Sequence, residues 1–194
     1  MKLTTRQWRP AIMLTLLLCI ITGAIYPGIV TALSQAIFPR EANGSLAIVN
    51  GTIVGSELIA QGFSEDRYFH PRPSSAGAGY DATASSGSNK GPTDRKLADT
   101  LIAGGVQEAV EQDGATPGKV PSDMVTRSAS GLDPHISPAN AALQVARVAK
   151  ARGVSEERIR ALVAAHTQGR QFGFLGEPRV NVLNLNLALD RMSP

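Results

Sequence analysis

The sequence contains little cysteine, few aromatic residues and no excess charge over most of its length. Cys19 is the only cysteine among 194 residues, which excludes an internal disulfide and any multi-cysteine zinc or iron–sulfur site. Aromatic residues make up 5% of the chain. Lys2, Arg6 and Arg9 precede every acidic residue. From Arg40 onward the chain therefore contains 16 basic and 16 acidic residues, and its formal charges balance. A nucleic-acid-binding surface needs a basic cluster, and none occurs in this part of the sequence.

Motifs of common enzyme classes are also missing. The glycine-rich residues 86–92 do not match the G-x-x-x-x-G-K-[ST] pattern of a phosphate-binding loop. His70, His135 and His166 are too far apart for the i, i+4 spacing of a helical metal site. A Ser-His-Asp triad has no fixed sequence spacing, so Asp133, His135 and one of the many serines leave a membrane-anchored hydrolase open as an alternative.

The N-terminus carries a long apolar stretch. No charged residue lies between Arg9 and Arg40, and a helix needs about 20 apolar residues to cross a hydrocarbon core of about 30 Å. A cleaved secretory signal is the alternative, but its apolar core spans only about 7–15 residues. The sequence therefore predicts a transmembrane signal-anchor helix over residues 11–38. Because the basic tip precedes the helix, we expect residues 1–10 to be cytoplasmic and residues 39–194 to form an extracytoplasmic domain.

A β-hairpin and a long loop are predicted to open this domain. Residues 45–49 and 52–54 flank Asn50-Gly51, a dipeptide typical of a type I′ turn, in which both residues have positive φ. Residues 64–92 are rich in Gly, Ser, Pro and Asn and contain few aliphatic side chains. They predict a long loop, and long ordered loops in compact domains are often functional.

Helices are expected in the second half. Residues from Thr93 or Asp94 to about Gln112 favour the first helix. Ser137 followed by proline is typical of an N-cap and first helical position, and this helix is predicted to end at Gly153. Ser155 is expected to cap the next helix, which would form an αα-hairpin with its predecessor.

The C-terminal segment leaves two interpretations open. Leucine alternates with other residues at Leu183, Leu185, Leu187 and Leu189, and a period of two favours a strand. A short strand followed by a helix is the alternative. Either way, the predicted fold class is α+β: a single N-terminal transmembrane helix followed by one small mixed extracytoplasmic domain.

Two turn-rich stretches, residues 68–92 and residues 120–138, are unusually specific for connecting loops. Both are rich in turn residues with free backbone donors, and the first also carries the aromatic residues Tyr68, Phe69 and Tyr80. They are expected either to pack as ordinary loops or to form a docking surface for a membrane partner. The residues that we expect to contact a partner are Phe69, Arg72, Ser88, Asn89, Asp133 and His135.

Four motifs carry a family resemblance over nearly the whole chain. They are FHPRPSSAG at residues 69–77, SGSNKGP at 86–92, SGLDPHISPANAALQVARVAKARG at 130–153 and LGEPRVNVLNLNLALD at 175–190. With the N-terminal anchor and the hairpin, they resemble the C subunit of the bacterial Kdp potassium-transporting P-type ATPase. One departure is Pro71, which stands where the family usually has glycine.

The resemblance implies an accessory, non-catalytic subunit of a high-affinity potassium importer. No Asp-Lys-Thr-Gly phosphorylation segment is present, so the chain is not the catalytic subunit itself. The implied partners are a channel-like potassium-binding A subunit, an ATP-hydrolysing B subunit and a small hydrophobic F subunit. The chain is expected to have no cofactor of its own, since ATP and K⁺ are handled by the complex. The implied location is the bacterial inner membrane, with a periplasmic domain.

The resemblance implies two roles for such a subunit. One is a catalytic chaperone that raises the ATP affinity of the B subunit, for which Gln144 matches the family glutamine with a nucleotide-related role. The other is a cap on the outer face of the A subunit. The predicted topology places Gln144 across the membrane from cytoplasmic ATP, so we expect any effect on ATP use to be allosteric. An anchored envelope scaffold is a further alternative, besides the hydrolase.

Overall fold

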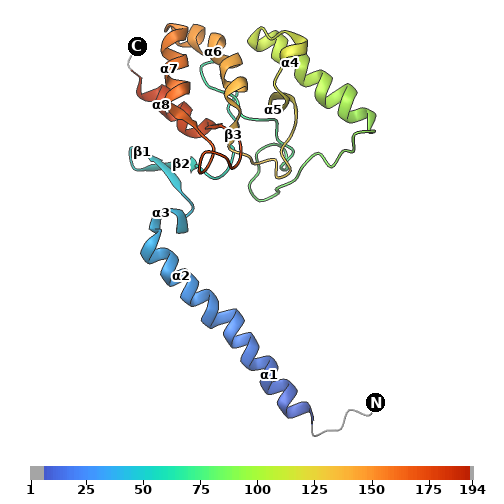
Figure 1. The fold of residues 1–194 in the computed structure, drawn as a ribbon, viewed down its shortest axis with the longest axis vertical. Coiled ribbons are helices and arrows are strands. Elements are labelled where there is room, and N and C mark those ends of the chain that lie inside the picture. Colours follow the sequence, from blue (N-terminus) through green and yellow to red (C-terminus); the bar gives the residue numbers. More distant parts are fainter. Residues whose placement is uncertain (1–6, 193–194) are drawn as a thin grey trace. The chain divides into compact units, whose positions relative to one another are not determined.

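The computed structural model describes residues 7–192 and divides after Leu46 into an N-terminal unit and a larger domain (Figure 1). The N-terminal unit contains α1 (Trp8–Ile20), a π-helical turn (Ile21–Ile25), α2 (Tyr26–Ile37) and the short α3 (Pro39–Ala42). The first three form one continuous helix of 30 residues, which is long and apolar enough to cross a membrane. This helix matches the apolar segment expected from the sequence, whereas its placement and orientation in a membrane stay predictions.

Proline explains the wide turn within this helix. Pro27 has no N–H to donate, and in a regular α-helix its ring would clash with the carbonyl four residues earlier, which here belongs to Gly23 in the π-helical turn. Two threonine hydroxyls donate hydrogen bonds to the backbone of the same helix. Thr15 donates to the Ala11 carbonyl at 2.9 Å, and Thr22 donates to the Leu18 carbonyl at 2.7 Å. Polar side chains with such local partners are tolerated in an apolar environment.

The predicted hairpin is confirmed. Strand β1 (Leu46–Val49) pairs with β2 (Thr52–Ser56). Asn50 has a φ of 50° and Gly51 a φ of 77°, as the two positive values of a type I′ turn require.

The larger domain adds short helices and a second small sheet. Its strands are β3 (His135–Ile136), β4 (Thr167–Gln168) and β5 (Arg179–Asn181). They form an antiparallel sheet in the order β3-β5-β4, with Ile136 and Thr167 both opposite Val180. Its helical elements are a π-helical segment (Lys96–Ile102), α4 (Ala103–Asp113), a 3₁₀ turn (Pro117–Lys119), α5 (Ser122–Val125), α6 (Pro138–Arg152), α7 (Glu156–His166) and α8 (Val182–Arg191).

The predicted starts of α6 and α7 are confirmed. Ser137 and Ser155, like Asn181 before α8, each accept a hydrogen bond from the backbone N–H three residues later. Gly153 ends α6 with a φ of 66°, the left-handed conformation that glycine adopts most easily.

The extended strand predicted for the C-terminus is wrong, and the alternative of a short strand followed by a helix is confirmed. The buried side chains of α8 include Val182, Leu185, Asn186 and Leu189, which recur at the i, i+3, i+4, i+7 spacing of a helix face. In a strand, Asn186 would lie on the face opposite the alternating leucines, whereas in α8 it is buried with Leu185 and Leu189.

The core lies where α6, α7, α8 and the small sheet meet, and Figure 1 shows these three helices grouped at one end of the domain. A single residue of the long loop, Phe69, completes it. The buried apolar side chains of this core are Phe69, Ile136, Ala141, Val145, Val148, Ala149, Ile159, Val163, Val180, Val182, Leu185 and Leu189.

Candidate functional site

Two side-chain amides hold the main chain of the loop at Phe69 and His70. Asn186 of α8 accepts from the Phe69 N–H at 2.9 Å and donates to the Phe69 carbonyl at 2.9 Å. Gln144 of α6 accepts from the His70 N–H at 2.7 Å and donates to the His70 carbonyl at 3.1 Å. Each amide thus pairs with one residue as a neighbouring strand would, and the two together fix the loop to helices α6 and α8.

Gln144 uses its full hydrogen-bonding capacity within the chain. Besides its two bonds to His70, its Oε1 accepts from Arg147 Nη2 at 2.7 Å and its Nε2 donates to Asn140 Oδ1 at 2.8 Å. Only 1% of Gln144 is exposed. In this structure both lone pairs and both protons of the amide are engaged, so its geometry is that of a structural clamp. Its nucleotide-related role stays a prediction.

Arg147 extends the clamp to α4. Its Nε lies 2.7 Å from Asp113 Oδ1, and both side chains are almost fully buried. Its Nη1 donates to the carbonyls of Asp66 and Tyr68 at 2.8 and 2.9 Å. Breaking a buried ion pair of this kind leaves an uncompensated charge, so Arg147 ties α4, α6 and the loop together.

The imidazole of His70 lies against this network. Its Nε2 is 3.4 Å from Arg147 Nη1 and 3.2 Å from the Glu65 carbonyl. Burial lowers the pKa of His70 below 6.5, and the positive charge of Arg147 lowers it further. Both effects favour the neutral form of His70 in the folded chain.

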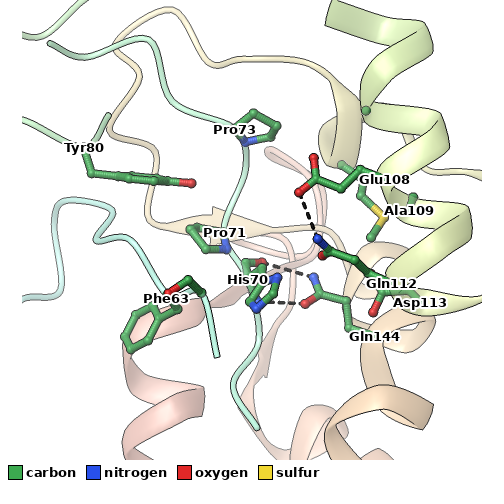
Figure 2. Close-up of a pocket in the computed structure, with 13 residues that line it drawn as sticks. Phe63, His70, Pro71, Pro73, Tyr80, Glu108, Ala109, Gln112, Asp113 and Gln144 are labelled. Atoms are coloured by element: carbon green, nitrogen blue, oxygen red, sulfur yellow. Dashed lines mark hydrogen bonds between the residues drawn. The ribbon is translucent and has the colours of Figure 1, made fainter. Parts of the chain in front are cut away.

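A cleft of about 310 Å³ opens beside this clamp, between the loop and α4 (Figure 2). On its α4 side, Glu108 accepts a hydrogen bond from Gln112 at 3.1 Å. On its loop side, the Tyr80 hydroxyl donates to the Arg72 carbonyl at 3.0 Å. Burial raises the pKa of Tyr80 above 10.0, and the charge of Glu108 adds to the effect. Residues 7–192 contain no group of three or more His, Cys, Asp or Glu side chains arranged to hold a metal ion.

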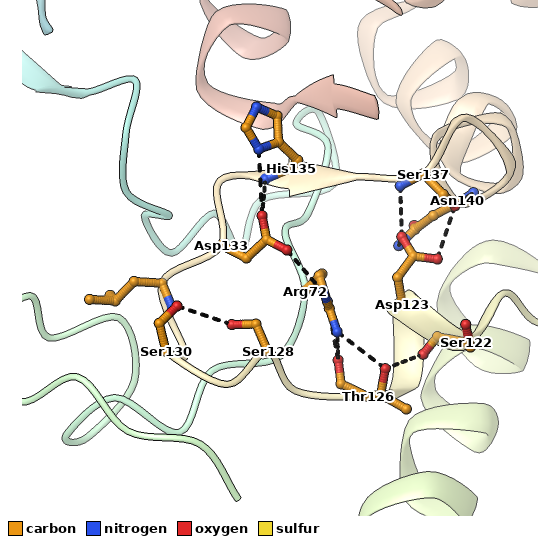
Figure 3. A network of polar contacts seen from close by, with 11 residues as sticks. Arg72, Ser122, Asp123, Thr126, Ser128, Ser130, Asp133, His135, Ser137 and Asn140 are labelled. Carbon is orange, nitrogen blue, oxygen red and sulfur yellow. Dashed lines mark hydrogen bonds and ion pairs between the residues drawn. The ribbon is translucent and has the colours of Figure 1, made fainter. Parts of the chain in front are cut away.

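A second polar network joins three of the residues predicted to dock a partner (Figure 3). Arg72 Nη1 lies 2.9 Å from Asp133 Oδ2, and its guanidinium also donates to the Thr126 carbonyl. Asp133 Oδ1 accepts from the His135 N–H at 3.0 Å. Burial opposes ionisation of Asp133, but hydrogen bonds from His135 and then Arg72 hold its pKa below 3.8. This network cross-links the two turn-rich stretches.

Asp123 fixes the start of α6 beside that network. Its carboxylate accepts from the Ser137 N–H at 2.7 Å, from the Ser137 hydroxyl at 2.9 Å and from Asn140 Nδ2 at 3.0 Å. Because Asn140 also binds Gln144, the two networks share α6. Asp123, Asn186 and Arg147 were not among the residues predicted for the site. For Asn186, a position on the same helical face as Val182, Leu185 and Leu189 is the signal that could have found it.

The residues predicted to dock a partner differ in how far they are buried. Phe69 has 0% exposure and belongs to the core, so its position gives the docking prediction no support. Arg72, Asp133 and His135 are brought together and remain partly exposed. Ser88 is partly exposed, and Asn89 is exposed with a φ of 52°.

Comparisons with known proteins place the chain in one family. The family described as "KdpC: K+-transporting ATPase, c chain" matches residues 8–191. A protein of Gemmatimonas aurantiaca is 60% identical over 186 residues, covering 95% of this chain and 92% of its own. A protein of Rhodospirillum rubrum is 54% identical and covers 97% of both chains. Both are described as a potassium-transporting ATPase KdpC subunit. The chain therefore belongs to the KdpC family, the c chain of the K⁺-transporting ATPase.

Proposed function

We propose that this chain is the accessory, non-catalytic subunit of a high-affinity, ATP-driven potassium importer. The observation that carries the proposal is family membership across residues 8–191, which includes both the membrane-span candidate and the domain. The site adds support, because its buried polar groups bind one another and fix loops. His70, His135 and His166 contact carbonyl groups, Asp133 and Arg147 within the chain. These contacts hold the loops in place, as a docking domain requires.

The proposed partners are a channel-like A subunit, an ATP-hydrolysing B subunit and a small hydrophobic F subunit. The chain is proposed to cross the bacterial inner membrane once, with its N-terminus in the cytoplasm and its domain in the periplasm, docked on the outer face of the A subunit. The basic tip and the absence of charge from Trp8 to Ile37, apart from Arg9 near its start, support this orientation.

The proposed support of ATP use is indirect. A periplasmic domain cannot contact cytoplasmic ATP, and the engaged amide of Gln144 supports a role in fixing the loop. Coupling of this kind requires that the domain contact two transport states of the complex differently. In this proposal the chain holds no cofactor of its own. ATP and K⁺ are handled by the complex as a whole.

The accessory function is tested by purifying the tagged full chain from mildly solubilised membranes of potassium-limited cells that express all the subunits. We expect a large channel-like protein and an ATPase to co-elute, and the eluate to hydrolyse ATP in response to K⁺. A chain that elutes alone, under conditions that preserve other membrane complexes, would contradict the proposal and favour an anchored enzyme or a scaffold.

The orientation is tested with one accessible cysteine. In a Cys19→Ala background, Glu157→Cys places a thiol on the exposed surface of α7. A membrane-impermeant thiol reagent should label it in cells whose outer membrane has been made permeable. Labelling that appears only after the inner membrane is lysed would place the domain in the cytoplasm and reopen direct contact with ATP.

A further inference from the structure

An exposed, hydrogen-bonded turn connects β4 and β5. Gln171 and Leu175 exchange two backbone hydrogen bonds, each 2.9 Å long. At the base of the turn, Arg170 Nη2 lies 2.7 Å from Glu177 Oε2. These contacts brace the turn, so its conformation is set before any partner arrives.

The turn presents three large apolar side chains to solvent, which we call the Phe tip: Phe172, Phe174 and Leu175. Their exposures are 87%, 70% and 47%. Phe172 also has a φ of 53°, in the left-handed region that is unfavourable for a bulky side chain. Phe172 is strained and mostly exposed, so it contributes little to the core, and such strain is typical of functional positions.

We propose that the Phe tip is a docking element that inserts into an uncharged, apolar hollow on another subunit of the potassium-transporting complex. The inference rests on the proposed accessory function and adds to it a contact element. None of the residues predicted from the sequence to contact a partner lies in this turn. Exposed aromatic side chains on a preorganised backbone are the common anchors of protein interfaces, because little entropy is lost when they bind.

The area of the tip favours a partner subunit over a second copy of the chain. A phenylalanine side chain buries about 150–250 Å², whereas a stable interface buries about 800 Å² per partner. The tip therefore serves as one anchor within a larger contact. A subunit that carries its own membrane-span candidate, Trp8–Ile37, is suited to such a divided interface, since its tip binds a partner that the membrane already keeps close.

Charge favours a protein hollow over a lipid surface. Binding to anionic headgroups uses basic side chains beside the apolar ones. Here residues 171–176 carry no charge, and the adjoining Arg170 is paired with Glu177. The Phe tip carries no charge, and the opposite charges of Arg170 and Glu177 below it offset each other. Both features match an uncharged apolar pocket.

Photocrosslinking identifies the occupant directly. p-Benzoylphenylalanine is introduced in place of Phe174, and in a separate chain in place of Phe172, with all subunits co-expressed. A matched control places it at Arg160, which is exposed on α7. We expect light-dependent adducts with another subunit from the two tip positions and none from the control. Adducts with lipid or with a second copy of this chain, or no adduct at all, would overturn the proposal.

Substitution separates docking from folding. Phe172→Gly removes the ring and relieves the positive φ, and Phe174→Ser removes the second ring. The free energy of unfolding of the double variant should be at least that of the original chain. In mild detergent, however, the double variant should retain at most about a tenth as much of the other subunits. Leu58→Ser is the control, because Leu58 is 59% exposed elsewhere in the domain. It should leave retention unchanged.

The outcomes distinguish the two proposals. If the unsubstituted chain fails to co-purify with other subunits, the accessory function fails. If it co-purifies and the double variant is retained equally well, only the tip assignment fails. An equal loss with Leu58→Ser would also refute that assignment, because any exposed apolar side chain would then have the same effect.

Discussion

Gln144 and Asn186 show how single side chains hold the loop. Each is 1% exposed, and each satisfies both the N–H and the carbonyl of one loop residue. A buried amide in such a position destabilises the fold little while all its hydrogen bonds are made. Removing the amide destabilises the fold strongly, because the backbone groups that it paired with stay buried without a hydrogen bond. The loop therefore depends on two residues that lie far from it in sequence.

Replacing the Gln144 amide is expected to destabilise the domain. Gln144→Leu leaves the His70 N–H and carbonyl, Arg147 Nη2 and Asn140 Oδ1 without this partner, and should lower the free energy of unfolding by about 2–4 kcal/mol. Urea unfolding of the full chain in detergent measures it. Gln107→Leu, on the exposed face of α4, is the matched control and should change stability by less than about 0.5 kcal/mol. Equal stabilities of the two variants would refute the clamp.

His70 is expected to make stability depend on pH. Its folded-state pKa lies below the 6.5 of the unfolded chain because it is buried and lies near Arg147. As the pH falls through 6.5, the unfolded state takes up the proton first, so His70 lowers stability progressively until the pH reaches its folded-state pKa.

Unfolding experiments between pH 8 and pH 5 measure this effect, with His70→Gln as the comparison. The original chain should lose more stability on acidification than the variant does. Parallel curves for the two chains would show that His70 does not contribute.

Among the elements, the SGLDPH turn illustrates how loops are joined by close backbone contact. Gly131 has a φ of 67°, and a Cβ there would lie 2.6 Å from the Ser86 carbonyl oxygen and 2.7 Å from the Ala76 nitrogen. Three segments thus meet at a position that has no room for a side chain. The polar network of Arg72 and Asp133 starts two residues later.

Gly131→Ala should therefore disrupt the junction. The left-handed conformation and the backbone clash are expected to lower the free energy of unfolding by about 2–4 kcal/mol. Gly104→Ala is the control, because Gly104 is helical and a Cβ there meets nothing within 4 Å. It should be neutral or stabilise the chain by up to about 1 kcal/mol. Thermal unfolding of both variants tests the contrast, and similar midpoints would contradict it.

At the scale of the whole molecule, the two units differ in what stabilises them. All residues of the apolar core come from Phe69 onward, whereas the helix Trp8–Ile37 buries none of its apolar window within the chain. An apolar helix of this kind needs lipid or a partner to cover it. The domain, in contrast, supplies its own core.

A chain that begins at Ser45 is expected to fold without the helix. It retains the hairpin, the clamp and the core, so it should show cooperative urea unfolding and stay in solution, whereas the full chain sediments with membranes. Circular dichroism and sedimentation measure the two properties. A truncated chain without a cooperative transition would mean that the helix contributes to the folding of the domain.

Several features follow from the sequence alone because their causes are local. The long helix depends on composition, the hairpin on Asn50-Gly51, and the starts of α6 and α7 on Ser137 and Ser155. The motifs of the loops and of the C-terminal segment were enough to indicate the family, which the comparisons then showed. Each of these signals is contained in neighbouring residues.

Tertiary structure decided the rest. The leucine alternation at residues 183–189 fits a strand or a helix, and α8 forms because one helical face buries Leu185 and Leu189 and places Asn186 against Phe69. Gln144 meets a backbone 74 positions away, and Asn186 one 117 positions away. Periodicity and caps carry no information at that separation, because only the packing of the helices determines which backbone groups a buried amide must satisfy.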